Sequence, residues 1–541
     1  MFKNILILLF SILIINSVSL AQGGGLIIGD NYRVFPSTTS QSEVFITKHP
    51  TNSSILFSSA NTLQFTPTFF VSEGVYVSTD AGQSWYGSDT CKGANIFFHG
   101  GDPSIAIDKD GNFILTRKGS TSFPGVYSHY STDNGITWSA QRTISTDELE
   151  RATIVSDSDP SSPYLGRTYV CWAKLVPPYS IGFSYTNDGA QNWFTPSSLS
   201  TVNLRRAGGE IALGPENQVY ICWAGVTSTS PFTEVQVGFA SSTNGGTNWN
   251  VNENAFNMNG IVGILANKQN IRVNGLPRIA VDLSNKSTRG NIYIVTAQKN
   301  LLPAGSDPDI ILRKSTDAGQ TWSAGIRVNQ DALNNGKTQF FTGITVDENG
   351  GLNIIYYDDR NTTSDSSSIF LARSTDGGSS FNEYEISDHN FKPSAIGGLG
   401  QGYMGDNIDI TSVGNKLYPV WMDNSTGTYQ IWSVPIEILS VGVDDENNFT
   451  VPSEFELKQN YPNPFNPSTS IEFNLPIGSN VSLKIFDATG KEVVTLINEF
   501  KGTGNHRINF EANKYNLSSG VYFYTLSADG LTQTKPMILL K

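Results

Sequence analysis

The sequence contains few charged residues: only 15% of its 541 residues are Asp, Glu, Lys or Arg. Its net charge is −13, which argues against nucleic acid or an anionic membrane as a partner. Long windows rich in Ala, Leu, Glu and Lys are absent, whereas Gly (51 residues), Asn, Ser and Thr are abundant and 11% of the residues are aromatic. This composition favours an all-β protein of many short strands and turns.

Cysteine is also scarce, with three residues. Cys171 and Cys222 lie in matching contexts, Val-Cys-Trp-Ala and Ile-Cys-Trp-Ala, and we interpret both as small core residues. Cys91 has no obvious partner, so a disulfide framework is not expected. The five His residues show no metal-ligand spacing, and no Gly-rich phosphate loop opens a helix. The sequence therefore predicts neither a metal nor a cofactor.

Only one long hydrophobic run occurs, from Ile5 to Ile15. Lys3 precedes it and Ser19-Leu20-Ala21 follows it, which predicts a secretory signal peptide over residues 1–21. No other segment is apolar enough to span a membrane. We expect the mature chain to begin near Gln22 and to act outside the cytoplasm.

One motif, S-x-D-x-G-x-x-W, recurs along the chain. Three copies are close matches, at Ser78–Trp85, Ser131–Trp138 and Ser315–Trp322, and three are looser, at Thr186–Trp193, Ser242–Trp249 and Ser374–Phe381. The steps between their central residues are 53, 55, 56, 73 and 59 residues, as in a repeat architecture. The central residues are Asp80, Asp133, Asp188, Asn244, Asp317 and Asp376.

Each position of the motif has a structural explanation. The Ser and Asp side chains can accept hydrogen bonds from backbone N–H groups of the turn. The Gly can adopt a positive φ, and the aromatic residue can anchor the turn on its neighbours. The motif therefore predicts a hairpin lock rather than a catalytic group.

Between the motifs, short apolar strands alternate with polar turns. First strands begin near Glu43, Ser104, Ala152, Glu210, Arg278, Thr342 and Asn407, which gives seven units. The last unit lacks a fourth strand, and the segment from Leu26 to Val34 is one spare strand. It could complete the last blade and remove the open sheet edges. We therefore expect a β-propeller of seven blades, with six blades as the alternative.

The motif resembles the bacterial neuraminidase repeat, or Asp-box, of sialidase-like propellers. The resemblance implies that residues 22–436 adopt this fold. The resemblance implies a glycan or a surface protein as ligand. It also raises the alternative of a sialidase-type exo-glycosidase that cleaves terminal sialic acid. A structural or adhesive surface protein is a further alternative.

Residues 437–452 are predicted to be a linker, and residues 453–541 a small Ig-like β-sandwich. This last segment contains Tyr461-Pro462-Asn463-Pro464-Phe465-Asn466-Pro467, the turn Asp487-Ala488-Thr489-Gly490 and the strand start Ser519-Gly520-Val521-Tyr522. It resembles the type A C-terminal sorting domain of type IX secretion cargo. The resemblance implies contact with the type IX secretion machinery, and release from the cell or attachment to its surface.

A binding site is expected at the propeller face opposite the Asp-boxes. First strands begin there and second strands end there, so their terminal charges could surround one polar funnel. The expected binding residues are Glu43, Asp102, Arg151, Glu210, Arg278, Asp358, Arg360, Asp406 and Asp423. A sialidase would need three Arg around a carboxylate, a Tyr nucleophile and acidic partners. The candidates are Arg117, Arg151, Arg278, Arg360, Tyr357, Asp102 and Glu210. We favour a binding protein over an enzyme.

Overall fold

The computed structural model describes residues 25–65, 70–93, 96, 99–199, 204–397, 399–439, 455–475, 479–501, 504–515, 517–528 and 530–540. The chain divides into two compact units, Met1–Val441 and Gly442–Lys541. The predicted signal peptide lies outside the described residues, and so does most of the predicted linker. The boundary between the two units falls within that linker.

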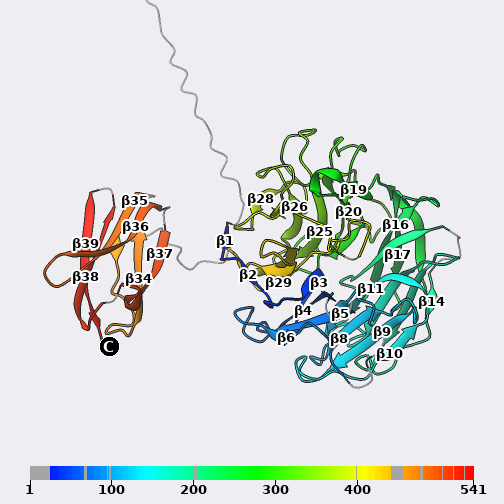
Figure 1. Ribbon diagram of the computed structural model, residues 1–541, viewed down its shortest axis with the longest axis horizontal. Coiled ribbons are helices and arrows are strands. Elements are labelled where there is room, and N and C mark those ends of the chain that lie inside the picture. Colours follow the sequence, from blue (N-terminus) through cyan, green and yellow to red (C-terminus); the bar gives the residue numbers. More distant parts are fainter. Residues whose placement is uncertain are drawn as a thin grey trace, which may run out of the picture. The chain divides into compact units, whose positions relative to one another are not determined.

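In the first unit, antiparallel strands form sheets around a common centre (Figure 1). Six sheets of the described residues each contain four strands paired in chain order. They are β3 (Ser40–Lys48), β4 (Leu56–Gln64), β5 (Phe70–Ser78) and β6 (Tyr86–Ser88); β7 (Ser104–Ile107), β8 (Phe113–Lys118), β9 (Val126–Ser131) and β10 (Arg142–Ser145); β11 (Leu149–Ser156), β12 (Thr168–Lys174), β13 (Ile181–Thr186) and β14 (Ser197–Ser198); β15 (Arg206–Leu213), β16 (Val219–Val226), β17 (Glu234–Ser242) and β18 (Asn250–Asn257); β21 (Arg278–Val281), β22 (Ile292–Gln298), β23 (Asp309–Ser315) and β24 (Ile326–Arg327); and β25 (Gln339–Val346), β26 (Leu352–Asp358), β27 (Ser368–Ser374) and β28 (Asn382–Glu385).

A further sheet joins both ends of this unit. It contains β29 (Asp409–Val413), β30 (Lys416–Asp423), β31 (Gln430–Ser433) and β32 (Ile436–Ile438) from the end of the unit, and β1 (Leu26–Ile28) and β2 (Tyr32–Arg33) from its start. β2 pairs with β31 and is the outer strand of this sheet, while β1 pairs with β32. The spare N-terminal segment therefore joins the last sheet, as predicted, and supplies two short strands rather than one.

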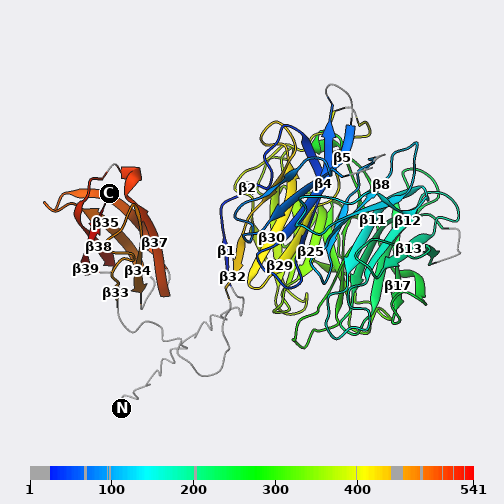
Figure 2. The ribbon, with the colours of Figure 1, turned by 90° about the horizontal axis from the view of Figure 1, so that it is seen from below.

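The first strands of the sheets form a closed ring. β3, β7, β11, β15, β21, β25 and β29 each contact the next, and β29 contacts β3. Figure 2 shows the sheets side by side from another direction. The fold is a β-propeller, as the repeat predicted. An additional hairpin, β19 (Gly263–Leu265), η1 (Ala266–Lys268) and β20 (Ile271–Val273), lies between β18 and β21 and was not predicted.

The Asp turns have the predicted hydrogen bonds. In the turn at Asp317, the Ser315 hydroxyl donates to the carboxylate (2.7 Å) and accepts from the Gly319 N–H (2.8 Å). The carboxylate also accepts from the Thr321 N–H (2.9 Å). Equivalent bonds to the central side chain occur in the other five copies. The motif is therefore a structural lock, as predicted.

Each lock also contacts the preceding sheet. The Trp322 ring lies edge-on to Phe239 of the preceding sheet, with ring centroids 5.2 Å apart. Trp249 contacts Phe183 in the same way at 4.9 Å. Gly319 has a φ of +86°, and a Cβ there would lie 2.1 Å from the Phe239 ring. Glycine is therefore required both for the turn and for the close approach of the two sheets.

The second unit is a β-sandwich, as predicted. One sheet contains β33 (Glu456–Leu457), β34 (Ser468–Leu475) and β37 (Gly504–Glu511), and the other contains β36 (Glu492–Lys501), β35 (Ser479–Phe486), β38 (Gly520–Ala528) and β39 (Leu531–Leu539). The short helix η2 (Ala512–Tyr515) follows β37. Buried residues of both sheets, including Phe473, Leu483 and Tyr524, form one core. The alternating burial along β34 and β35 explains why the sequence pattern identified them.

We predict that Asp317→Ala lowers the free energy of unfolding by about 1–2 kcal/mol, because the N–H of Thr321 and the hydroxyl of Ser315 lose their acceptor. Asp317→Asn should cost less, since Asn244 accepts the N–H of Asn248 in the equivalent turn (2.9 Å). Urea unfolding of both variants measures the difference. Equal stability of the Ala variant and the wild type would contradict the structural role.

His389 should make stability depend on pH. Its Nε2 lies 3.1 Å from the Asp423 carboxylate and its Nδ1 lies 2.6 Å from that of Asp388. Asp423 is the main cause of the increase in the pKa of His389 to about 9, above its ordinary value of 6.5. The stabilisation is therefore complete below about pH 6.5 and is lost as the pH rises through 9. We predict that His389→Gln flattens the fall in melting temperature between pH 6.5 and 9.5, whereas His49→Gln leaves that slope unchanged.

Candidate functional site

A cluster of ion pairs closes the propeller axis. Arg151 donates from Nη2 to Oε1 of Glu210 (2.5 Å), and Arg278 donates from Nη1 to the same oxygen. Arg151 also donates from Nη1 to Oδ1 of Asn407. The three charged residues lie on the inner strands β11, β15 and β21 and are largely buried. The sequence predicted that these residues surround the axis, and the structure brings them together.

The two arginines already bind a carboxylate of the protein itself. The remaining nitrogens of Arg278 donate to the backbone carbonyls of Thr342 (3.2 Å) and Ile408 (3.0 Å). The space between the guanidinium groups is thus occupied by Glu210 rather than open to a ligand. This arrangement stabilises the ring and leaves no carboxylate-sized vacancy between Arg151 and Arg278.

Acidic residues surround the axis on the side where the inner strands begin. Glu43 is buried and accepts from Nδ2 of Asn61 (2.8 Å). Burial and the nearby carboxylates of Asp406 and Asp102 raise the pKa of Glu43 well above its usual value. Asp406 accepts from Nδ2 of Asn274 (2.6 Å).

The cavity at this end holds only about 10 Å³, which is room for about one water molecule. The loop before β29 contributes to the closure, because the Tyr403 hydroxyl lies 3.0 Å from Nδ2 of Asn61 and 3.2 Å from the Ser42 hydroxyl. The open funnel expected at this face is therefore not present along the axis. Side chains of the protein fill it.

Several predicted site residues lie away from the axis. Arg117 is fully buried and donates to Nε2 of His129 (2.9 Å). Arg360 pairs with Asp358 (2.6 Å) and with Glu383 (2.7 Å). The prediction that Arg117 and Arg360 join a cluster with Arg151 and Arg278 is therefore wrong. The reason is that each arginine has an acidic partner elsewhere: Arg117 lies 3.8 Å from Glu73 of the neighbouring sheet, and Arg360 pairs within its own sheet.

Two other predicted residues are structural. The hydroxyl of Tyr357 donates to the backbone carbonyl of Met422 (2.6 Å), and burial raises the pKa of this tyrosine well above its usual value. It cannot serve as an exposed nucleophile in this environment. Asp423 is buried and accepts from His389 and from Nε1 of Trp421 (3.0 Å). It does not line the axis.

Beyond the ion-pair cluster, the axis widens toward the Asp turns. A chamber of about 170 Å³ is bordered by the charged side chains of Glu210, Arg278 and Asp409. Six inner strands each place an isoleucine around this chamber: Ile46, Ile105, Ile154, Ile211, Ile279 and Ile344. Burial raises the pKa of Asp409 to about 6. Thr47, Ser104 and Thr153 also border the chamber, so its lining combines polar, charged and apolar residues.

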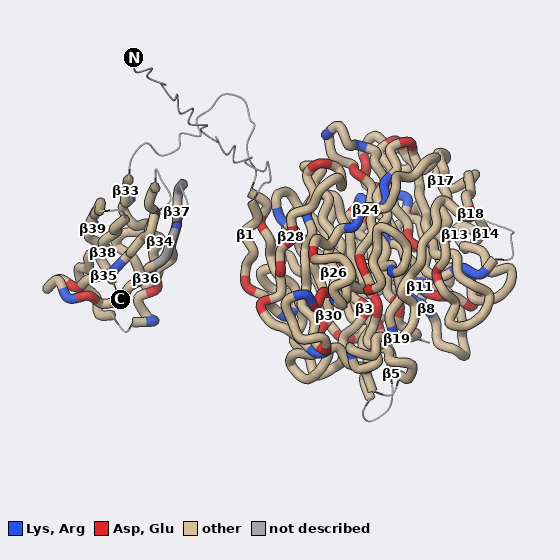
Figure 3. The backbone as a smooth tube through the Cα atoms, turned by 90° about the horizontal axis from the view of Figure 1, so that it is seen from above, with Lys and Arg blue, Asp and Glu red and all other residues tan. Residues whose placement is uncertain are grey.

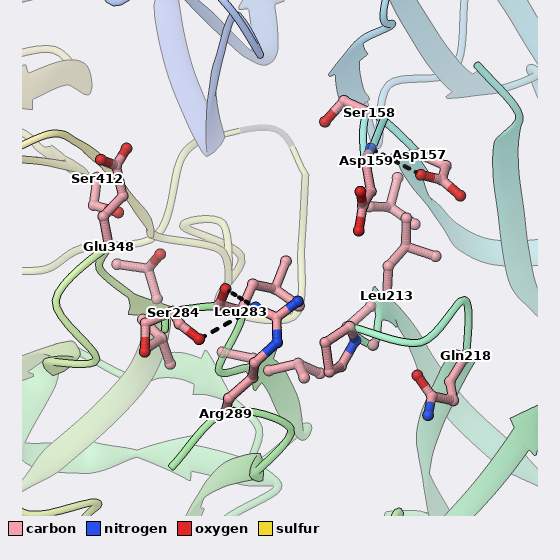
Figure 4. Close-up of a pocket in the computed structure, with 18 of the residues that line it drawn as sticks. Asp157, Ser158, Asp159, Leu213, Gln218, Leu283, Ser284, Arg289, Glu348 and Ser412 are labelled. Atoms are coloured by element: carbon pink, nitrogen blue, oxygen red, sulfur yellow. Dashed lines mark hydrogen bonds between the residues drawn. The ribbon is translucent and has the colours of Figure 1, made fainter. Parts of the chain in front are cut away.

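A cavity of about 860 Å³, called the axial cavity below, lies next to this chamber (Figure 4). Ile211, Ile279 and Ile344 border both spaces. Its other walls are the connections between first and second strands of four sheets, residues 156–162, 213–218, 281–289 and 345–349, together with Lys48, Thr411 and Ser412. The predicted site residues do not line this cavity.

This cavity opens at the Asp-turn end of the propeller. Arg167 belongs to the connection between β11 and β12, which also borders the cavity. It donates from Nη1 to the carbonyl of Gly245 in the Asp turn of the next sheet (2.9 Å). The sequence analysis expected a site at the opposite face. The structure instead has this cavity at the Asp-turn end.

Polar side chains dominate the mouth of this cavity. Figure 4 shows Asp157, Asp159 and Gln218 on one side and Arg289 and Glu348 on the other. Opposite charges are interspersed, as they are over the propeller as a whole (Figure 3). The cavity thus offers both donors and acceptors, with four carboxylates, Asp157, Asp159, Asp347 and Glu348, and two cations, Lys48 and Arg289.

A recurring aspartate in the sequence marks this end of the propeller. A buried aspartate starts the connection between first and second strands at Asp108, Asp157, Asp282 and Asp347. Asp347, for example, accepts from the N–H groups of Asn349 (2.9 Å) and Gly351 (3.0 Å). These residues fix the turns that surround the cavity, and their spacing marks where it lies.

Comparison with known proteins finds one matching family model in each unit. Residues 459–540 match the family model of the secretion system C-terminal sorting domain, and residues 129–140 match that of the BNR/Asp-box repeat. The C-terminal unit carries a secretion sorting domain. Its presence indicates type IX secretion to the cell surface or the extracellular space. No helix of the described residues is long and apolar enough to cross a membrane.

Similar solved structures are distant. A protein of unknown function from Dyadobacter fermentans is 12% identical, covers 76% of this chain and 99% of its own, and has a TM-score of 0.46. A polysaccharide lyase of family PL25, an ulvan lyase, is 10% identical over 74% of this chain and 95% of its own, with a TM-score of 0.47. PorZ of Porphyromonas gingivalis is 12% identical over 90% of this chain and 69% of its own, with a TM-score of 0.35. No curated protein sequence matches the chain.

Among the described residues, no group of three or more His, Cys, Asp or Glu side chains could hold a metal ion.

We predict that Glu210→Gln lowers the free energy of unfolding by about 3–5 kcal/mol, because two buried guanidinium groups lose their shared carboxylate. Glu348→Gln, which removes an exposed carboxylate, should cost less than about 1 kcal/mol. Denaturant unfolding of the two variants measures the contrast. Similar losses for both would show that the axial cluster is not a stabilising element.

Proposed function

We propose that this secreted or surface-attached β-propeller is a binding protein without catalytic activity, and that it binds a glycan in the axial cavity at the Asp-turn end. The cavity is the observation that carries the proposal. Its volume of about 860 Å³ is within the usual range for ligand sites. Its walls come from several sheets, so the propeller holds them in fixed positions.

The lining suits a ligand with many hydroxyl groups. Ser158, Gln218 and Ser284 provide hydroxyl and amide groups, while Asp159 and Arg289 provide charged acceptors and donors. Apolar residues such as Leu213 and Leu283 lie between them (Figure 4). A saccharide presents the same mixture of hydroxyl groups and apolar ring faces. The choice of a glycan also follows the resemblance to sialidase-like propellers, which by itself concerns the fold.

The sialidase alternative has less support. It requires three arginines around a free carboxylate site, a reactive tyrosine and an acidic partner. Arg151 and Arg278 bind Glu210 instead, and the hydroxyl of Tyr357 is buried against a backbone carbonyl. Arg117 and Arg360 lie elsewhere. We therefore expect the protein not to hydrolyse a fluorogenic sialoside.

A glycan array with the full chain tests the proposal. We predict that Ser158→Trp, which places a large ring in the cavity, weakens binding of any glycan found by at least tenfold, or about 1.4 kcal/mol. Ser122→Trp serves as the control, since Ser122 is an exposed residue between β8 and β9 at the other end of the propeller. Equal binding by the two variants would exclude the axial cavity as the site. Turnover of the sialoside would favour the enzyme alternative.

A further inference from the structure

Arg205 is an arginine held by aromatic rings on the face opposite the Asp turns. Its guanidinium carbon lies 4.0 Å from the ring centroid of Phe232 and 5.5 Å from that of Tyr179. Tyr179 lies in the connection between β12 and β13, and Phe232 in that between β16 and β17. Connections between second and third strands lie at the end opposite the Asp turns. The cluster is therefore separate from the axial cavity.

The backbone around these rings is fixed. Tyr179 and Phe232 both adopt a positive φ, 54° and 59°, which is uncommon for aromatic residues. Their N–H groups donate to the carbonyls of Val176 (2.9 Å) and Thr229 (2.8 Å). The buried Arg206 donates from Nη1 to the carbonyls of Tyr179 (2.8 Å) and Leu204 (2.7 Å). The Arg206 bonds tie the Tyr179 loop to the start of β15, and the bond between Phe232 and Thr229 closes the turn of the other loop, so the position of Arg205 is preorganised.

The guanidinium of Arg205 has no hydrogen bond or ion pair with any residue that the structure describes, although the side chain is half-buried. Arg33, Arg142 and Arg272 also have no such partner among the described residues, but none of them lies over two aromatic rings. Arg167 and Arg206 differ from Arg205 in having partners. Arg167 also lies over aromatic rings, but it donates to Asn187 (2.8 Å) and Gly245 (2.9 Å). Arg206, next in the chain, pairs with Glu253 (2.5 Å). Arg205 thus keeps its donors available in a chain whose net charge is −13.

We propose that Arg205 is an anion-binding subsite that takes a carboxylate or a sulfate group of an acidic saccharide. The planar guanidinium presents paired N–H donors that match two oxygens of such a group. The rings of Phe232 and Tyr179 hold the plane in place and favour the cation. The exposed side chains of Val176 (41%), Leu204 (46%) and Val235 (39%) lie on the same loops and strand ends. They provide an apolar rim for the rest of the ligand. The saccharide nature of the ligand rests on the proposed function, whereas the anion preference rests on Arg205.

Calorimetric titration of the full chain with matched saccharides tests this subsite. Dextran sulfate is compared with dextran, and a galacturonate oligomer with its methyl ester, so that each pair differs only in the anionic group. We expect binding of at least one anionic member and no equivalent binding of its neutral partner. Binding of only the sulfated saccharide, or of only the carboxylated one, would identify which anionic group the subsite takes and would support the proposal.

The variants Arg205→Gln and Arg205→Lys locate the effect. Arg205→Gln should weaken binding of the anionic member about tenfold to a hundredfold, the usual range for lost charged hydrogen bonds. Arg205→Lys should weaken it less, because it keeps the charge but loses the planar pair of donors. Arg142→Gln removes the same charge from an exposed arginine on β10 and should leave affinity nearly unchanged. Melting temperatures of all variants check that the fold is retained.

Three outcomes would overturn the proposal: no binding of either anionic saccharide, unchanged binding by Arg205→Gln, or an equal loss in Arg142→Gln. These outcomes can be distinguished from the outcome in which the axial cavity does not bind a glycan. Loss of glycan binding in Ser158→Trp together with normal binding in Arg205→Gln would support the axial cavity as the binding site and contradict the anion subsite. The reverse result would support the subsite at Arg205 and contradict the axial cavity as the binding site.

Discussion

The contact between each Asp turn and the preceding sheet is the interaction on which the propeller depends. The turn is locked by hydrogen bonds within a few residues, such as those of Ser315 and Thr321 to Asp317. The locked turn then places its aromatic residue on the neighbouring sheet, as Trp322 does on Phe239. A local sequence motif thus determines a contact between sheets. The contact is repeated in the six sheets that carry an Asp turn, so each of these is oriented by the sheet before it.

The two ends of the axis differ because different side chains reach it. The inner strands β3, β11, β15 and β25 contain register shifts near their N-terminal ends. Such bulges redirect side chains and expose backbone groups. Charged residues, among them Glu43, Arg151 and Glu210, gather in this region and neutralise one another. Toward the Asp turns the strands are regular and place isoleucines on the axis. The cavity lies at this end, between the connections of the first and second strands.

Much of the fold could be predicted from the sequence, because its determinants are local. The Asp-turn motif and the alternation along β34 each involve residues that are close together in the chain, and the regular recurrence of the motif marks the successive sheets. The positions of Arg151, Glu210 and Arg278 near the axis followed from the same spacing. The secretion sorting domain was identifiable for a similar reason, since its turns and strand starts occur in one continuous segment.

The partners of individual side chains could not be predicted in the same way. Successive residues of a strand point to opposite faces, so an error of one position reverses the environment of an arginine. Arg117 and Arg360 lie near strand ends, and no local pattern indicates their pairing with His129 and Glu383. The stacking of Arg205 on Tyr179 and Phe232 joins three separate loops and has no local pattern.

The sheet that contains both ends of the propeller also constrains the order of folding. Tyr32 pairs with Ser433, so this pairing must wait until nearly the whole propeller has been synthesised. Until then the first segment of the folding chain keeps an unsatisfied edge, and a secreted protein of this design has to be protected from premature association before its ring closes.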